Sequence, residues 1–252
     1  LTTCGYGPKP AGVEDHVQIP DDLVYWHRNK VALLLHLYQS AYWSSPAVKF
    51  AYERLNSRHF DTILADDLDT VGVALALEPK YGVHADLHEY SPREKEDVPR
   101  WRYFVAPYVK WQLRTFVTNA KSSTTVGQRI AQEYRDNFGL SPDVVTNATP
   151  FHDLQPTPVK SPIALVHSGA GRRDRYMEVM IDAVENAEQD FTFDLYLTPN
   201  DPEYIEQLKA QTAESTRVTI HDAVPYKDLV RTLNQYDVGI HLLPPVNFNN
   251  EY

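Results

Sequence analysis

The sequence alternates short apolar segments typical of strands with amphipathic segments typical of helices, most clearly in its last stretch. From Val218, VTIHDAV is typical of a strand, and KDLVRTLNQY is typical of a helix whose Leu229, Val230 and Leu233 share one face. VGIHLLPP follows as an apolar strand closed by two prolines. A strand, a helix and a second strand form the unit of a parallel sheet, so the pattern predicts an α/β fold.

The alternation forms two series, separated by a proline-rich segment. In the first series DTILADD and VHADLHEY are strands around a helix, and in the second PIALVHSG and FTFDLYL are strands around another. FHDLQPTPVKSP lies between them with three prolines and is typical of a linker. We therefore predict a domain over residues 1–152, a linker over 153–162 and a second domain over 163–252.

The remaining periodicity predicts further elements of the first domain. Gly139 follows an amphipathic run and is expected to end its helix. The other expected elements are helices over Val31–Trp43, Ala47–Leu55 and Val105–Val117, a helix from Thr70 ended by Gly82, and a strand near Phe116–Asn119.

Composition excludes several classes of protein. The chain has 252 residues, enough for two domains that each bury a core, and no apolar run approaches the roughly 20 residues that span a bilayer. A lone Cys4 excludes internal disulfides and thiolate metal clusters, and there is no basic and apolar leader, which together favour the cytoplasm. The formal charge of −10 argues against a nucleic-acid partner.

Several motifs occur in a characteristic order along the chain. These are FDTILADDLDT, DLHEYSPRE, TTVGQRIAQEY with VVTNATPF, and the VPY turn that precedes the last helix and its DVG strand. The ordered set resembles the GT4 family of retaining glycosyltransferases, which have the GT-B architecture of two Rossmann-like domains. The resemblance implies transfer of a sugar from a nucleotide diphosphate donor to a glycan or lipid-linked acceptor hydroxyl. It also implies retention of configuration, no essential metal or other cofactor, and a role in cell-surface glycan or glycolipid synthesis.

The chain departs from the family pattern at both ends. In the family a strand and a glycine-rich loop precede the motifs seen here, and a helix with two glutamates that hold the donor follows them. We therefore expect both domains to be incomplete, and the chain to bind donor weakly and transfer little sugar. The alternative functions are a non-catalytic module that binds a sugar or nucleotide, and a nucleotide-sugar epimerase of the same architecture.

The segment HSGAGRRDR follows an apolar strand and precedes a helix. Glycines allow backbone amides to approach a phosphate, and guanidinium groups bind phosphate in a forked geometry. The predicted donor-binding residues are Ser168, Gly169, Gly171, Arg172, Arg173 and Arg175. A dinucleotide-binding loop is disfavoured, because Asp174 stands where its third glycine would be. A plain turn with surface arginines is the other interpretation.

His88 and Glu89 follow the strand VHADL, where open α/β sheets bind ligands. By the resemblance, His88 is the catalytic candidate that contacts the donor sugar at the domain interface, and Glu89 supports its loop. A solvated strand end is the alternative.

Asp67 and Asp69 spell a DxD motif, which in another glycosyltransferase architecture binds a metal. A helix follows them at once, so capping of that helix or lining of the acceptor-side cleft is favoured over metal binding.

A basic stretch with interleaved aromatic residues lies within residues 100–129. Helical spacing puts Lys110, Arg114 and Lys121 on one face, and Phe104, Tyr108 and Trp111 on another. One interpretation is a surface that rests on anionic lipid at the cytoplasmic face of a membrane. The favoured interpretation is a helix that packs its aromatic residues inward.

Overall fold

The protein, described here from a computed structural model over residues 1–251, consists of two compact units. Unit 1 contains Leu1–Ala148 and the residues from Pro245 onwards, and unit 2 is Thr149–Pro244. The residues from Pro245 onwards thus belong to unit 1, whereas the sequence analysis assigned them to the second domain. The reason is the short helix α11 (Phe248–Glu251), whose Phe248 is buried in the core of unit 1, with its ring 5.2 Å from that of Tyr90.

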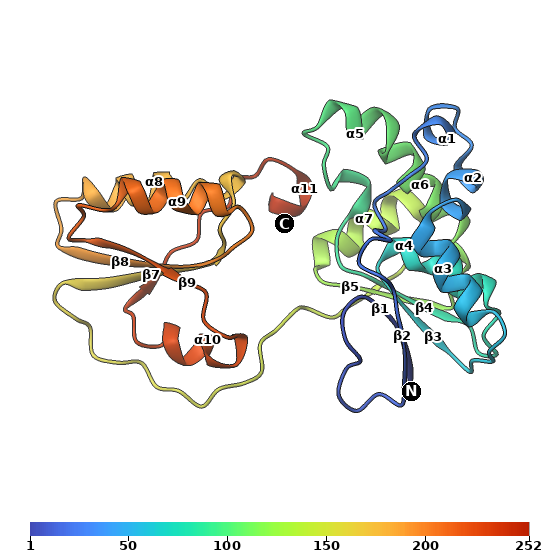
Figure 1. The fold of residues 1–252 in the computed structure, drawn as a ribbon, viewed down its shortest axis with the longest axis horizontal. Helices are drawn as coiled ribbons and strands as arrows, with labels where there is room; N and C mark the ends of the chain where they lie inside the picture. Colours follow the sequence, from blue (N-terminus) through green and yellow to red (C-terminus); the bar gives the residue numbers. More distant parts are fainter. Residues whose placement is uncertain (252) are drawn as a thin grey trace. The chain divides into compact units, whose positions relative to one another are not determined.

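The main sheet of unit 1 has four parallel strands in chain order. The strands are β3 (Ile63–Asp66), β4 (Val83–Leu87), β5 (Ser122–Thr125) and β6 (Asp143–Val144). Each crossover advances in the same direction, so right-handed connections put their helices on one face of the sheet (Figure 1). These helices are α4 (Leu68–Ala76), α5 (Pro99–Phe104), α6 (Ala106–Thr115) and α7 (Gln128–Phe138).

The alternation of β4 separates the two faces of this sheet. Val83, Ala85 and Leu87 are buried in the core, whereas His84 and Asp86 are half-buried on the opposite face. On the core side Gly72 of α4 lets two rings approach, because a Cβ there would lie 2.6 Å from Tyr42 and 2.8 Å from Phe116.

The remaining elements of unit 1 are helices α1 (Lys30–Leu34), α2 (Tyr38–Trp43) and α3 (Pro46–Leu55), and a two-stranded parallel sheet of β1 (Thr2–Gly5) and β2 (Asp15–Gln18).

Three predicted helices of unit 1 have other bounds. The helix expected over Val31–Trp43 is two helices, because His36 has a φ of 56° and breaks the hydrogen-bond series. The helix expected over Val105–Val117 is α6, which spans Ala106–Thr115, and the separate helix α5 precedes it. The helix expected to end at Gly82 ends at Ala76, and Glu78 (φ 49°) and Gly82 (φ 97°) form the turn into β4.

Two further predictions at helix ends were tested. The strand expected near Phe116–Asn119 is wrong: Val117–Asn119 is a 3₁₀ turn in which Val117 is buried in the core, and strand β5 begins at Ser122. The prediction that Gly139 ends its helix is confirmed, since it caps α7 with a φ of 68°.

The sheet of unit 2 also has four parallel strands, but its order reverses at β7. The order is β10 (Val238–Gly239), β7 (Ile163–Ala170), β8 (Phe191–Thr198) and β9 (Val218–Asp222). The reversal puts helices on both faces (Figure 1). Helices α8 (Met177–Glu185) and α9 (Pro202–Gln211) cover one face, and α10 (Tyr226–Leu233) lies on the other.

The core of unit 2 forms between the sheet and the pair α8 and α9. Phe193 and Leu195 of β8 are fully buried there against Met177, Ile181 and Leu208. Two separate parallel sheets with crossover helices confirm the predicted fold of two Rossmann-like domains. Within residues 1–251, no helix has the length and apolar character needed to cross a bilayer.

Candidate functional site

Of the two predicted donor-binding glycines, Gly169 lies in a strand and Gly171 directly after it, where the sequence predicted a loop. Strand β7 extends to Ala170, so Ser168 and Gly169 pair with β8 as strand residues. Gly171 follows the strand and packs tightly, because a Cβ there would lie 2.7 Å from Ile205 of α9. Its N–H donates to the Thr198 carbonyl at 3.1 Å. The need for glycine at this position is therefore explained by packing between β7 and α9.

The three arginines of the segment have different environments. Arg172 donates two hydrogen bonds to Asp174, at 3.0 and 2.7 Å. Arg173 lies 3.3 Å from the carboxylate of Asp201 and donates to Gln207 at 2.8 Å. Arg175 is half-buried, and its guanidinium has no hydrogen-bond or ion-pair partner in residues 1–251. Of the predicted phosphate ligands, Arg175 thus presents a guanidinium with no internal carboxylate to neutralise it.

The start of α8 is already satisfied by protein groups. A 3₁₀ turn, Arg173–Arg175, and a left-handed Tyr176 (φ 50°) separate β7 from α8. The Met177 N–H donates to the Tyr204 hydroxyl at 3.0 Å, and that hydroxyl donates to the Glu178 carboxylate. The helix therefore does not begin directly after the glycines, as the sequence suggested, and its first amide is not free for an anion.

His167, which the sequence analysis did not single out, lies two residues before Gly169 on the same face of β7. It is 3% exposed, and the Ile240 carbonyl lies 2.9 Å from its Nδ1. Nε2 is buried without a hydrogen-bond partner. Burial lowers the pKa of His167. The signal that could have found it is a histidine inside the apolar run IALVHSG, since a buried polar side chain needs a partner.

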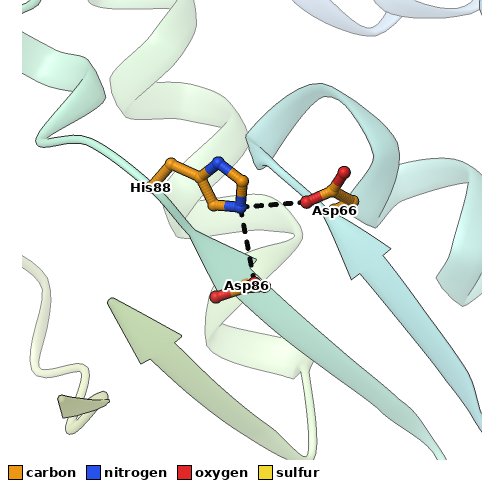
Figure 2. A group of neighbouring side chains, drawn as sticks. All are labelled: Asp66, Asp86 and His88. Atoms are coloured by element: carbon orange, nitrogen blue, oxygen red, sulfur yellow. Dashed lines mark ion pairs between the residues drawn. The ribbon is translucent and has the colours of Figure 1, made fainter. Parts of the chain in front are cut away.

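In unit 1, His88 lies between two carboxylates at the carboxyl ends of β3 and β4 (Figure 2). Its Nε2 is 3.0 Å from Asp66 Oδ1 and 3.4 Å from Asp86 Oδ2. The side chains of His88 and Asp66 are 47% and 71% exposed, so the group is open to a ligand. Sequence analysis selected His88 but missed both aspartates, although Asp66 in DTILADD and Asp86 in VHADLHEY lie near the ends of adjacent strands.

A second polar row orients Asp86 from β5. Thr124 donates its hydroxyl proton to Asp86 Oδ1 at 2.6 Å, and His84 Nε2 lies 3.0 Å from the same hydroxyl oxygen. Because Thr124 donates its one proton to Asp86, His84 Nε2 must be the donor to Thr124. Asp86 is thus held in place while its second oxygen faces His88.

The same three side chains could hold a cation. One ligand atom from each of Asp66, Asp86 and His88 lies within 4.8 Å of the others, and these are ligand types that divalent metals accept. In this arrangement His88 Nε2 contacts both carboxylates directly. The expectation of no essential metal stays a prediction.

The DxD aspartates have separate structural partners. Asp67 caps α4 by accepting from the Leu68 N–H at 2.7 Å, which confirms the predicted capping for this residue, whereas Asp69 lies in the first turn of the helix. Asp69 accepts from Arg28 at 3.1 Å and from Gln112 at 3.0 Å. Partial burial raises the pKa of Asp67.

Glu89, the predicted support of the His88 loop, acts through its backbone: its carbonyl accepts from the hydroxyl of the buried Tyr134. Partial burial, with a smaller contribution from the nearby Glu94 carboxylate, raises the pKa of Glu89.

The basic stretch of residues 100–129 largely follows the favoured interpretation, in which a helix packs its aromatic residues inward. Tyr108 is buried and Trp111 packs against the core of unit 1, while Phe104 is exposed. Lys110 and Arg114 are exposed on α6. The predicted face is wrong for Lys121, which lies outside the helix, just before β5. Contact with a membrane stays a prediction.

Comparisons with known proteins identify the fold. No protein-family model and no curated protein sequence matches the chain. Similar solved structures include the pneumococcal O-GlcNAc transferase GtfA with UDP and GlcNAc, which is 13% identical with a TM-score of 0.55. HepE from Anabaena, with UDP and glucose, is 16% identical with a TM-score of 0.58. The lipopolysaccharide outer core galactosyltransferase WaaB is 10% identical with a TM-score of 0.55.

These alignments cover most of this chain but less of some neighbours. The alignment with GtfA includes 76% of this chain and 40% of GtfA. The alignment with HepE includes 92% and 61%, and that with WaaB 94% and 71%. The chain therefore spans well under two thirds of GtfA. At these identities the likeness shows that the chain has the GT-B fold of these transferases.

Proposed function

We propose that this chain is part of a glycosyltransferase that transfers a sugar from a nucleoside diphosphate donor to an acceptor hydroxyl. Unit 2 binds the donor, and unit 1 binds a glycan or lipid-linked acceptor. The GT-B fold supports this proposal, as does the UDP bound in GtfA and HepE. The ordered motifs favour the GT4 family, with retention of configuration and no essential metal.

The observation that carries the proposal is the free guanidinium of Arg175 beyond the carboxyl end of β7. Arg172 and Arg173 are paired with carboxylates, so Arg175 can add a charge-assisted hydrogen bond to a phosphate oxygen without breaking an internal ion pair. Charge grows on the leaving diphosphate as the sugar bond breaks. A cation placed there stabilises the transition state more than the ground state.

His88 gives unit 1 a suitable group for sugar hydroxyls. The Asp66 and Asp86 carboxylates fix the imidazole by its Nε2, which leaves Nδ1 for a hydroxyl (Figure 2). The exposed oxygens of Asp66 can accept from further hydroxyls. His88 is accordingly the proposed catalytic contact to the sugar, and Asp66 and Asp86 position it.

The WaaB likeness supports a role in cell-surface glycan or glycolipid synthesis, and the proposed location of that role is the cytoplasmic side of a membrane. A lipid-linked acceptor would bring the enzyme to that surface, and the exposed Lys110 and Arg114 are the proposed contacts to anionic lipid.

Calorimetric titration with UDP tests the donor site. Arg175→Ala is expected to weaken UDP binding by roughly 10- to 100-fold, because one charge-assisted hydrogen bond contributes about 1.5 to 3 kcal/mol. Arg231→Ala on α10 is the matched control, since it removes an exposed arginine of the same unit at the end of another helix. Equal UDP affinity in wild type and Arg175→Ala would reject the assignment.

A further inference from the structure

The buried Nε2 of His167 lies where an open α/β sheet binds its ligand. Strand order reverses at β7, so the switch point of unit 2 lies between the carboxyl ends of β7 and β10. His167 belongs to the last half of β7, and its Nδ1 contacts Ile240, the residue that follows β10. The ring therefore bridges the two strands that border the switch point.

The contact to Ile240 fixes which ring nitrogen carries the proton. A carbonyl oxygen only accepts, so Nδ1 must be the N–H donor at 2.9 Å. Burial favours the neutral ring, and the lone pair is then on Nε2. This nitrogen is a hydrogen-bond acceptor with no donor in residues 1–251.

The surroundings leave this acceptor close to the ligand side of the sheet. Gly169 lies two residues on, and a Cβ there would approach Nε2 to 3.0 Å, so a side chain at this position would crowd the nitrogen. The ring of His241 stacks on His167 with centroids 5.8 Å apart, and His241 is exposed. The buried ring of His167 is thus stacked against an exposed one.

An acceptor buried without a partner opposes folding, and a leucine at position 167 would avoid that cost. The cost is recovered when a ligand supplies the missing donor. The diphosphate of a nucleotide sugar is esterified at both ends and has only acceptor oxygens, so it cannot supply one. The nucleoside part of a nucleotide has the necessary donors in its ribose hydroxyls and the imide N–H of uracil.

We propose that His167 is a specificity-determining residue of the donor site, where its Nε2 accepts a hydrogen bond from the nucleoside part of the bound nucleotide. The inference rests on the proposed function, because it places the nucleotide at the carboxyl end of β7. Arg175 binds the diphosphate, and His167 distinguishes a nucleoside diphosphate from diphosphate alone.

The test compares UDP with inorganic pyrophosphate by calorimetry, with thermal unfolding measured on every variant. In His167→Asn the amide N–H replaces Nδ1 toward Ile240 while Nε2 is lost, and His167→Leu removes both nitrogens. Both variants are expected to bind UDP roughly tenfold more weakly, the effect of one lost hydrogen bond, and to bind pyrophosphate as wild type does. In His167→Gln an amide oxygen reaches the place of Nε2, so part of the UDP affinity should return.

Two results would overturn the inference while leaving the proposed function intact. One is wild-type UDP affinity in His167→Leu together with a higher unfolding temperature, which would mark His167 as structural. The other is an equal loss of UDP and pyrophosphate affinity. Failure of wild type to bind UDP would instead reject the proposed function, and this inference with it.

Discussion

The two sheets differ in strand order although both are four-stranded and parallel. In unit 1 the strands follow chain order, all crossovers advance one way, and β4 exposes polar residues such as His84 on the face away from the helices. In unit 2 the order reverses at β7, and helices cover both faces (Figure 1). Among the described strands, only unit 2 therefore has a switch point, where a ligand enters between strand ends.

The carboxyl ends of the two sheets also differ in charge. In unit 1 two carboxylates, Asp66 and Asp86, surround His88. In unit 2 the corresponding end has Gly169, the unpaired Arg175 and the buried His167. We therefore expect the second edge to bind an anion through Arg175, and the first to bind hydroxyls. Similar topology thus yields opposite binding chemistry because the end residues differ.

The largest expected effect comes from reversing the charge at the unit 2 edge. Arg175→Glu should lower UDP affinity by more than roughly 100-fold, since it removes a charge-assisted hydrogen bond and adds a carboxylate beside the diphosphate. Titration calorimetry measures the change, with Arg231→Glu on α10 as the control for an equal change in net charge. Comparable losses in both variants would mean that net charge, and no local contact, attracts the nucleotide.

An intermediate effect is expected on the stability of each unit when its packed glycine gains a methyl group. Gly72→Ala forces Cβ against Tyr42 and Phe116 in unit 1, and Gly171→Ala forces it against Ile205 in unit 2. Each should cost about 1 to 3 kcal/mol of unfolding free energy in denaturant titrations. The matched controls are Gly5→Ala and Gly239→Ala, where no atom lies within 4 Å of the new Cβ. Losses no larger than in the controls would show that the neighbours yield easily.

The smallest effect is a pair of opposite pH dependences. Burial lowers the pKa of His167, so its contribution to stability is present above about pH 6.5 and is lost as pH falls through the folded value. Burial raises the pKa of Asp67, so its contribution is present below about pH 3.9 and is lost as pH rises through the folded value.

Thermal unfolding against pH measures both dependences. His167→Leu should gain on wild type as pH falls below about 6.5, and Asp67→Asn, which keeps an oxygen for the Leu68 N–H, should gain as pH rises above about 3.9. A constant difference between variant and wild type across pH would contradict either prediction.

The sequence predicts the elements of both units well where local signals are strong. The Gly139 cap and the strands β7, β8 and β9 follow from glycine chemistry and apolar runs, whereas the strand expected over VGIHLLPP is only the exposed pair Val238–Gly239 of β10. The left-handed residues His36 and Glu78 could not be predicted, because an L-residue adopts positive φ only when tertiary contacts outweigh its steric cost. The turn at Phe116–Val117 was mistaken for a strand because both residues are apolar, and their burial among helices decided otherwise.

The candidate sites show the same division. Strand ends identified His88 and the arginines of unit 2 as candidates, because parallel strands expose their last residues at one edge. The sequence could not show which arginine is free: the partner of Arg173 is Asp201, on the far side of α8 and β8 in the chain. It could not pair His88 with Asp66 either, since only strand register brings them together.

The sequence by itself determined that this chain is an α/β protein of two strand–helix series, with an arginine-rich segment after a strand of the second. Periodicity, glycines and prolines act over a few residues, and these local effects suffice for that result. Only the tertiary structure decided the reversal of strand order at β7, the free state of Arg175 and the unpartnered Nε2 of His167. These depend on contacts between residues far apart in the chain, where packing and desolvation set which polar groups keep a partner.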